Sequence, residues 1–264
     1  MQPHRVTSET SRTRGTSLRT LRWVGLLVFV TIACGRVERR AESTLEGDFS
    51  LGEAVATDHG CDGEVSRATH RHTSGGIRMY HQAAEGPVVG GRLRRLSGRL
   101  DTFEISDPKA FGDGMVPEKE PYTFWSSGIT LGFLVGEGGV IGGASTVFAD
   151  EVSVWPWARL LLGDLDTIWF EADVGAEDPL YYAPYGGAGI GFQSDWVRGR
   201  TGLSLYGHLL PDDEGHLQRS FGSSLVDLGL YADLTVQVGP LGVVLGGLFG
   251  EGMTGRVGLS YTLK

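Results

Sequence analysis

The stretch Val226-Asp-Leu-Gly-Leu-Tyr-Ala-Asp-Leu-Thr-Val-Gln-Val238 alternates between two kinds of residue without a break. Its even positions are all apolar, and its odd positions include Asp227, Tyr231 and Asp233. Successive side chains of a strand point to opposite faces, so the stretch predicts a strand with one oily and one polar face. Gly239-Pro240 then predicts a tight turn into a second alternating strand, and the two together form a hairpin.

The same period of two recurs from about Tyr122 to the last residue. Most candidate strands are about ten residues long, which suits a tilted strand that crosses a hydrocarbon core. Lipid offers the backbone no hydrogen-bond partners, so a closed antiparallel sheet is the only kind of sheet that can span it. The candidate strands cover residues 129–135, 139–149, 154–163, 168–174, 184–196, 198–209, 225–238, 241–249 and 256–263.

These strands predict an all-β fold, an antiparallel up-and-down transmembrane β-barrel of 8 to 10 strands. Ten is favoured, because bacterial single-chain barrels usually have an even number of strands. With the apolar faces turned toward lipid, four arginines and five acids point inward, and we expect them to pair and fill the lumen. This predicted lumen network consists of Arg159, Glu171, Asp173, Asp195, Arg198, Arg200, Asp227, Asp233 and Arg256.

Tryptophans such as Trp125, Trp157 and Trp169 lie near the ends of candidate strands. Outer-membrane barrels carry girdles of aromatic residues at both membrane interfaces. We therefore expect these side chains to lie in such girdles.

The N-terminus carries the pattern of an export signal. Five arginines precede an apolar run over 24–33, which ends at Cys34. The run is too short for a helix that spans a bilayer, so residues 1–34 are predicted to be a signal peptide. Thr31-Ile-Ala-Cys34 resembles the lipobox of bacterial lipoproteins, which implies lipidation of Cys34, while plain cleavage also fits the sequence.

Residues 35–120 lack a sustained period and are interrupted by glycine and proline, so we expect a poorly ordered linker or plug-like segment. One strand near 88–100 fits within it, and the barrel is predicted to occupy 121–264. His59, Cys61, His70, His72 and His81 also lie in this segment. Their spacing matches no metal-binding motif, so we predict neither a metal nor another cofactor.

The last strand resembles a family signal. Arg256-Val-Gly258-Leu-Ser-Tyr261-Thr-Leu263 resembles the C-terminal β-signal of bacterial outer-membrane barrels in its four specified positions, Arg256, Gly258, Tyr261 and Leu263. The resemblance implies recognition by the barrel-assembly machinery and a place in the outer membrane of a Gram-negative-type cell envelope. Lys264 departs from the pattern, because family members commonly end on an aromatic residue.

Charge and motifs exclude several classes of function. The net charge is -9, and no candidate strand supplies the basic face that nucleic acid requires. No hydrolase or nucleotide-binding motif is present, and Ser204 and His208 would stand roughly 13 Å apart along one strand, so we do not expect an enzyme. The prediction is a barrel embedded in the lipid bilayer with a structural, adhesive or narrow-pore role. One alternative is a lipid-anchored periplasmic binding module of lipocalin type, and a more distant one is a lipid-modifying enzyme.

Overall fold

The computed structural model describes residues 40–59, 65–105, 121–149, 152–180, 183–211, 217–220, 227–250 and 252–264. These residues contain no helix long and apolar enough to cross a membrane. The strands are β1 (Glu42–His59), β2 (Val65–Gln82), β3 (Gly86–Ile105), β4 (Pro121–Val135), β5 (Gly138–Phe148), β6 (Val152–Asp164), β7 (Ile168–Gly175), β8 (Ala183–Gln193), β9 (Val197–Pro211), β10 (Leu217–Ser220), β11 (Asp227–Val238), β12 (Leu241–Phe249) and β13 (Met253–Leu263).

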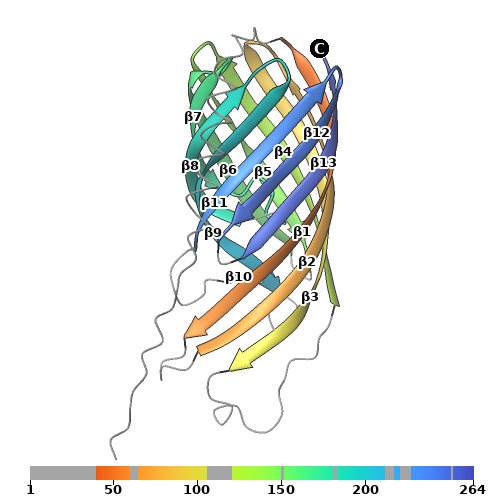
Figure 1. Ribbon diagram of the computed structural model, residues 1–264, viewed down its shortest axis with the longest axis vertical. Helices are drawn as coiled ribbons and strands as arrows, with labels where there is room; N and C mark the ends of the chain where they lie inside the picture. The colour runs from red at the N-terminus through yellow and green to blue at the C-terminus, as the bar shows by residue number, and fades with distance from the viewer. Residues whose placement is uncertain are drawn as a thin grey trace, which may run out of the picture.

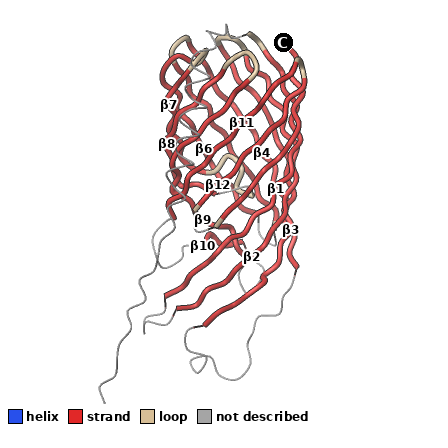
Figure 2. Tube along the Cα trace, viewed as in Figure 1, coloured by secondary structure: helices blue, strands red, loops and turns tan. Residues whose placement is uncertain are grey.

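The strands close into a cylinder, as Figures 1 and 2 show. Consecutive long strands pair antiparallel, and the ring closes where β1 pairs with β13, with Ser43 opposite Leu263. Strand β9 pairs with both β8 and β11, while the short β10 adds to β9 outside the ring. The predicted closed antiparallel barrel is confirmed, but the predicted number of 8 to 10 strands is wrong, because the ring has twelve.

The additional strands come from the segment predicted to be a linker. Strands β1, β2 and β3 lie within residues 35–120, and the strand expected near 88–100 is part of β3. They are 18, 18 and 20 residues long, against about 9–11 needed to cross a bilayer, and they project beyond the other strands (Figure 1). Glycines and charged residues interrupt the apolar alternation along these strands and hide them in the sequence. The linker prediction and the barrel boundary at residue 121 are therefore wrong.

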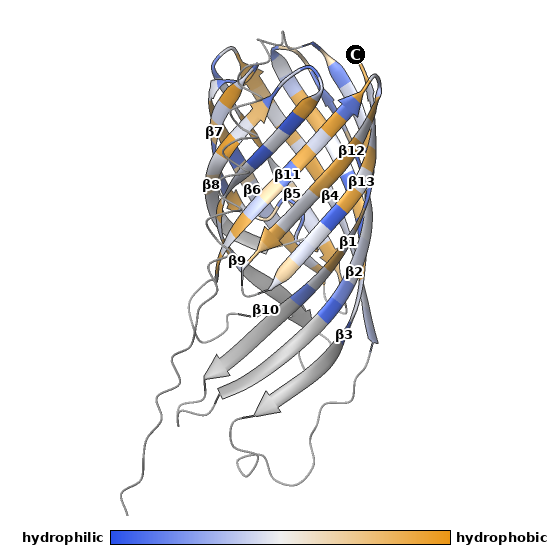
Figure 3. Ribbon diagram, viewed as in Figure 1, coloured by the Kyte–Doolittle hydropathy of each residue, from blue (hydrophilic) through white to orange (hydrophobic). Residues whose placement is uncertain are grey.

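Apolar side chains cover the outside of the barrel. Figure 3 shows hydrophobic and hydrophilic residues following one another along the described strands. Leu228 and Leu230 of β11 point outward, as do Val257 and Leu259 of β13, with Leu259 68% exposed to the surroundings. The predicted alternation is confirmed in these strands. A lipocalin-like binding module would need the apolar faces inside, so that alternative is contradicted.

The two ends of the barrel differ. Short turns join β2 to β3, β4 to β5, β6 to β7, β8 to β9 and β11 to β12 at one end, where Lys264 also lies (Figure 1). We call this the short-turn end and the opposite one the long-loop end. In outer-membrane barrels the short turns face the periplasm. Residues 1–39 lie outside the described residues, so the signal peptide and the fate of Cys34 stay predictions.

Several large rings point into the barrel and find space over glycines of the next strand. A Cβ atom added at Gly191 would overlap the ring of Trp169, its register partner on β7. One added at Gly202 would lie 2.8 Å from the hydroxyl of Tyr231. Trp125 does lie outside, as expected for a girdle residue, but Trp157 and Trp169 are buried inside, so the girdle prediction is wrong for them.

Candidate functional site

Six arginines from five strands point into the barrel and form the centre of the candidate site. Alternation places Arg92 and Arg94, two residues apart on β3, on the same inward face. Their side chains are only 5% and 3% exposed. We call the set the arginine belt; it consists of Arg78, Arg92, Arg94, Arg159, Arg200 and Arg256.

Carboxylates on the wall pair with this belt. Arg94 donates to Asp48 at 2.7 Å, and the Nε of Arg256 lies 3.1 Å from the same carboxylate. Arg200 donates to Asp233 at 3.0 Å, and Tyr231 donates to Glu171 at 2.7 Å. Buried charges without partners would cost several kcal/mol each, so these pairs make the polar interior tolerable. The wall carboxylates are Glu46, Asp48, Glu171, Asp173 and Asp233.

The connection between β7 and β8 folds back into the lumen. Its first residues, Ala176 to Leu180, are buried at both ends, with Ala176 at 0% and Leu180 at 2% exposure. Gly175 precedes it with a φ of +76°, a conformation that favours glycine. Ser145 of β5 donates a hydrogen bond of 2.8 Å to the backbone carbonyl of Glu177. We call residues 176–180 the inner loop.

Two acids of the inner loop reach the arginine belt. Glu177 lies 3.2 Å from Arg159, 3.4 Å from Arg78 and 3.7 Å from Arg92. Asp178 accepts a hydrogen bond of 2.7 Å from Arg94. Burial alone would raise the pKa of Glu177, but the positive charges, Arg159 first, outweigh burial and lower this pKa to about 2. The loop is therefore held in the lumen by ionised side chains.

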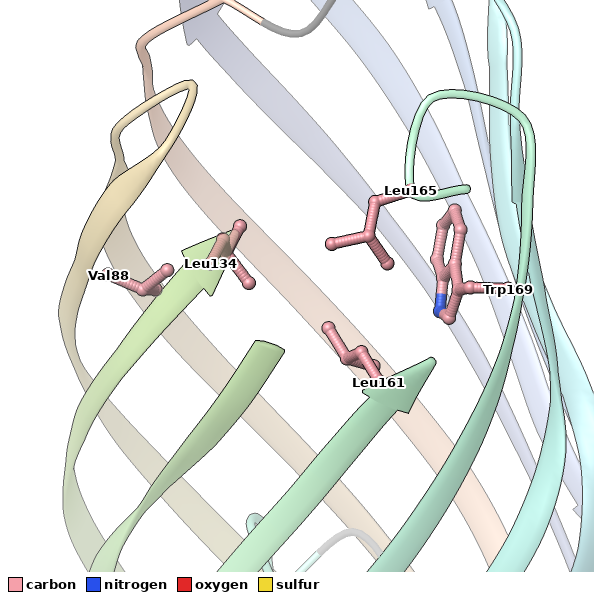
Figure 4. Close-up of a cluster of buried hydrophobic side chains, with 5 residues drawn as sticks. All are labelled: Val88, Leu134, Leu161, Leu165 and Trp169. Carbon is pink, nitrogen blue, oxygen red and sulfur yellow. The ribbon is translucent and has the colours of Figure 1, made fainter. Parts of the chain in front are cut away.

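Apolar layers lie on both sides of the belt. Toward the long-loop end, Leu180 packs with Leu96, Phe124 and Val147 on the inner wall. Toward the short-turn end, a second buried cluster lines the opening, and Figure 4 shows Leu165 of the β6–β7 turn beside Trp169. The cluster consists of Val88, Leu134, Leu161, Leu165 and Trp169.

Two cavities of different size lie in the lumen among the described residues. One of about 40 Å³ lies within the belt and has room for a few water molecules. A larger polar one of about 270 Å³ lies at the short-turn end, between residues such as Gln82, Arg198 and Gln237. The lumen is thus roomier at the short-turn end than at the belt, where the inner loop lies.

The structure distributes the predicted lumen residues over three places. Arg198 pairs with Glu42 at 3.0 Å beside the larger cavity, and Asp195 is exposed in the β8–β9 turn, outside the central network. The side chain of Asp227 lies outside the described ones. Six predicted residues do lie together at the belt: Arg159, Glu171, Asp173, Arg200, Asp233 and Arg256.

Sequence reasoning missed the other half of the network. These residues lie on β1 to β3 and in the inner loop, both of which were expected to be irregular. A usable signal was present in β1, where Glu46 and Asp48 alternate with Leu45 and Phe49. The missed residues are Glu46, Asp48, Arg78, Arg92, Arg94, Glu177 and Asp178.

The remaining candidates lie elsewhere. Tyr261 and Leu263 of the predicted assembly signal point outward, and Arg256 points inward. Ser204 is buried on β9, while the side chain of His208 is outside those described. His81 pairs with Ser43 at 2.9 Å, and the described residues contain no group of three side chains fit to hold a metal.

Comparison with known proteins finds similarity to solved barrels. An outer-membrane channel of Pseudomonas putida F1 matches with a TM-score of 0.47 and 10% identity, over 86% of this chain and 97% of that one. A mutant porin of Rhodopseudomonas blastica matches with a TM-score of 0.31 and 8% identity, over 85% of this chain and 100% of that one. OprB of Pseudomonas putida matches with a TM-score of 0.30 and 8% identity, over 94% of this chain and 98% of that one. No family model and no curated protein matches the chain.

Proposed function

We propose that this chain is an outer-membrane β-barrel that acts as a narrow pore, with the inner loop as its constriction. The observation that carries the proposal is the place of residues 176–180 inside the cylinder, where Glu177 joins three arginines of the wall. A protein with only a structural or adhesive role has no need of a loop inside its lumen.

The number of strands supports a pore. Barrel diameter grows with the number of strands, and about eight strands already leave an interior that side chains just fill. Twelve strands enclose more space. The inner loop occupies part of it, and it is attached to the wall by ion pairs and by Leu180, so it can leave without breaking the sheet.

The outer surface supports the membrane location. Alternate side chains on the strands are apolar and exposed, and a closed sheet leaves no backbone groups unpaired in lipid. As part of the same proposal, residues 1–34 direct export, with Cys34 either lipidated or removed. Arg256, Gly258, Tyr261 and Leu263 then serve the barrel-assembly machinery. The paired state of the lumen charges favours a passage over a catalytic centre.

The test is conductance in planar lipid bilayers. The wild-type protein is compared with a variant that carries Glu177→Ser, Asp178→Ser, Pro179→Gly and Leu180→Ser. We expect small steps for the wild type and steps several times larger for the variant, because the loop loses its anchors. Glu53→Gln is the control, since it removes an exposed carboxylate that pairs with Arg71 away from the belt. Equal conductance of all three proteins, or none, would refute the pore.

A further inference from the structure

The inner loop places two carboxylates where a bound anion would sit. Among the described residues, Glu177 is the one carboxylate that pairs with Arg92, whose Nε has no hydrogen-bond partner among them. Arg94 is shared between Asp48 on the wall and Asp178 on the loop. A guanidinium group carries five donors and suits carboxylates, so both arginines can bind another anion if the loop leaves.

The charge of the wall also calls for an anion. The belt has six arginines, and the wall faces them with the five carboxylates Glu46, Asp48, Glu171, Asp173 and Asp233. Without the inner loop the wall keeps an excess of one positive charge. Of the six arginines, Arg92 is the one with no wall carboxylate among its described partners, so the excess lies at β3.

An apolar pocket adjoins these arginines. Leu180 follows the two loop acids by two residues and lies against Leu96, Phe124 and Val147. Leu96 is two residues from Arg94 on the same inward face of β3. Tyr122 and Trp155 pack at the edge of this pocket. A carboxylate bound at Arg92 or Arg94 would thus carry its apolar part into the place of Leu180.

We propose that the inner loop occupies a binding site for a small organic anion, a carboxylate with an aromatic or short apolar group. Glu177 and Asp178 stand in for its carboxylate, and Leu180 stands in for its apolar part. Such an anion competes with the loop and binds as the loop leaves the lumen. The inference rests on the proposed pore function, because it names the solute that the constriction would select.

The test measures binding of sodium benzoate to the detergent-solubilised full-length protein by isothermal titration calorimetry. In the variant Glu177→Gln/Asp178→Asn the loop no longer competes, and we expect benzoate to bind about tenfold tighter or more than to the wild type. Benzamide, which has the same shape without the charge, and acetate, which lacks the apolar part, should both bind at least about tenfold more weakly than benzoate.

Two further substitutions assign the site. Adding Arg92→Gln to that variant should abolish the gain in benzoate affinity, whereas adding Arg71→Gln should leave it, because Arg71 is exposed and pairs with Glu53 outside the belt. Equal binding of benzoate and benzamide, or a gain that survives Arg92→Gln, would overturn the inference.

Assembly of the protein is checked by its migration on gels before and after heating. If the double variant fails to assemble, the variant Leu180→Ala replaces it, because this substitution keeps every charge and loosens the loop. Tighter benzoate binding by Leu180→Ala than by the wild type supports the site, and unchanged binding refutes it. Calorimetry needs no ion flow, so the two proposals fail separately. A protein that conducts without binding benzoate refutes the site, and one that binds without conducting refutes the pore.

Discussion

Arg94 of β3 donates a hydrogen bond of 2.7 Å to Asp178 of the inner loop, although β4, β5 and β6 separate β3 from β7 in the sheet. A contact across three strands means that the loop extends over the inner face of these strands, where Ser145 and Val147 of β5 and Phe124 of β4 also lie against it. Glu177 of the same loop pairs with Arg78 on β2, one strand farther along the sheet. The loop is therefore anchored to several strands, and in the proposed pore these anchors decide how open the lumen is.

The glycine at the start of the inner loop should be required for its position. At Gly175, φ is +76° and an added Cβ would overlap the carbonyl oxygen of Pro156. Gly175→Ala should displace the loop and raise conductance several-fold, because the left-handed conformation alone costs about 1–2 kcal/mol with a side chain. Gly255→Ala, at a position with no neighbour within 4 Å of the new atom, is the control. Identical conductance of the two variants would speak against a docked loop.

Acid should loosen the inner loop only at low pH. The pKa of Glu177 falls from 4.5 to about 2 in the folded barrel. A lowered pKa means that ionised Glu177 stabilises the docked state fully above pH 4.5, and that this contribution is lost as the pH falls toward 2. Conductance measured against pH should stay constant at neutral pH and rise below about 4. The variant Glu177→Gln should lack this rise; a rise between about pH 7 and 5 would indicate histidine instead.

A single hydroxyl in the lumen should matter for stability. Tyr231 donates to Glu171, which is 1% exposed, so Tyr231→Phe leaves a buried carboxylate oxygen short of a donor. We expect a loss of about 1–3 kcal/mol in the free energy of unfolding, measured by urea titration in lipid vesicles. Tyr261→Phe changes an outward tyrosine that is 45% exposed and should cost less than about 0.5 kcal/mol. Similar losses for both would contradict the assigned bond.

The loss of stability caused by a charge on the outer surface should depend on how deep that charge lies in the membrane. Leu245 lies in the middle of β12 and points outward, so Leu245→Arg should cost about 2–4 kcal/mol of unfolding free energy in lipid vesicles. Val238 ends β11 at the short-turn end and is 80% exposed, so Val238→Arg should cost about 0–1 kcal/mol in the same urea titration. A penalty that ignores position would argue against a membrane around these residues.

Strands are predicted best from the sequence where one of their faces lies in lipid. Outward side chains of β11 to β13 lie against hydrocarbon, so Leu228, Val243 and Leu259 alternate with inward residues and reveal their strands. The same rule identified the inward charges Arg200 and Asp233, which do pair. Because one face of each strand is buried in the lumen and the other lies in lipid, polar and apolar residues alternate in the sequence. This alternation can be recognised without knowing the fold.

The same rule did not identify β1 to β3. Arg95 points outward from β3 and lies 5.8 Å from the ring of Trp125, which is the arrangement expected at a membrane interface. Beyond that level β3 continues to Ile105. Because Arg95 takes an outward position where an apolar residue is expected, the alternation of β3 is interrupted, and this strand with Arg92 and Arg94 was not recognised.

The inner loop could not be predicted for a different reason. Ala176 to Leu180 contains two acids and a proline, a composition typical of a solvated turn. Its place in the lumen depends on arginines that are distant in the sequence, such as Arg94, and on a pocket formed by three strands. Local sequence carries no record of such partners.

The pairing of Ser43 with Leu263 also sets an order of events in biogenesis. Since β13 completes the hydrogen bonding of β1, the cylinder stays open until its last strand has been delivered. Until β13 pairs with it, β1 presents a row of unpaired backbone donors and acceptors, to which other chains can pair and aggregate. Pairings so distant along the chain also form slowly. The exposed edge of β1 is therefore protected from mispairing only once Leu263 lies opposite Ser43.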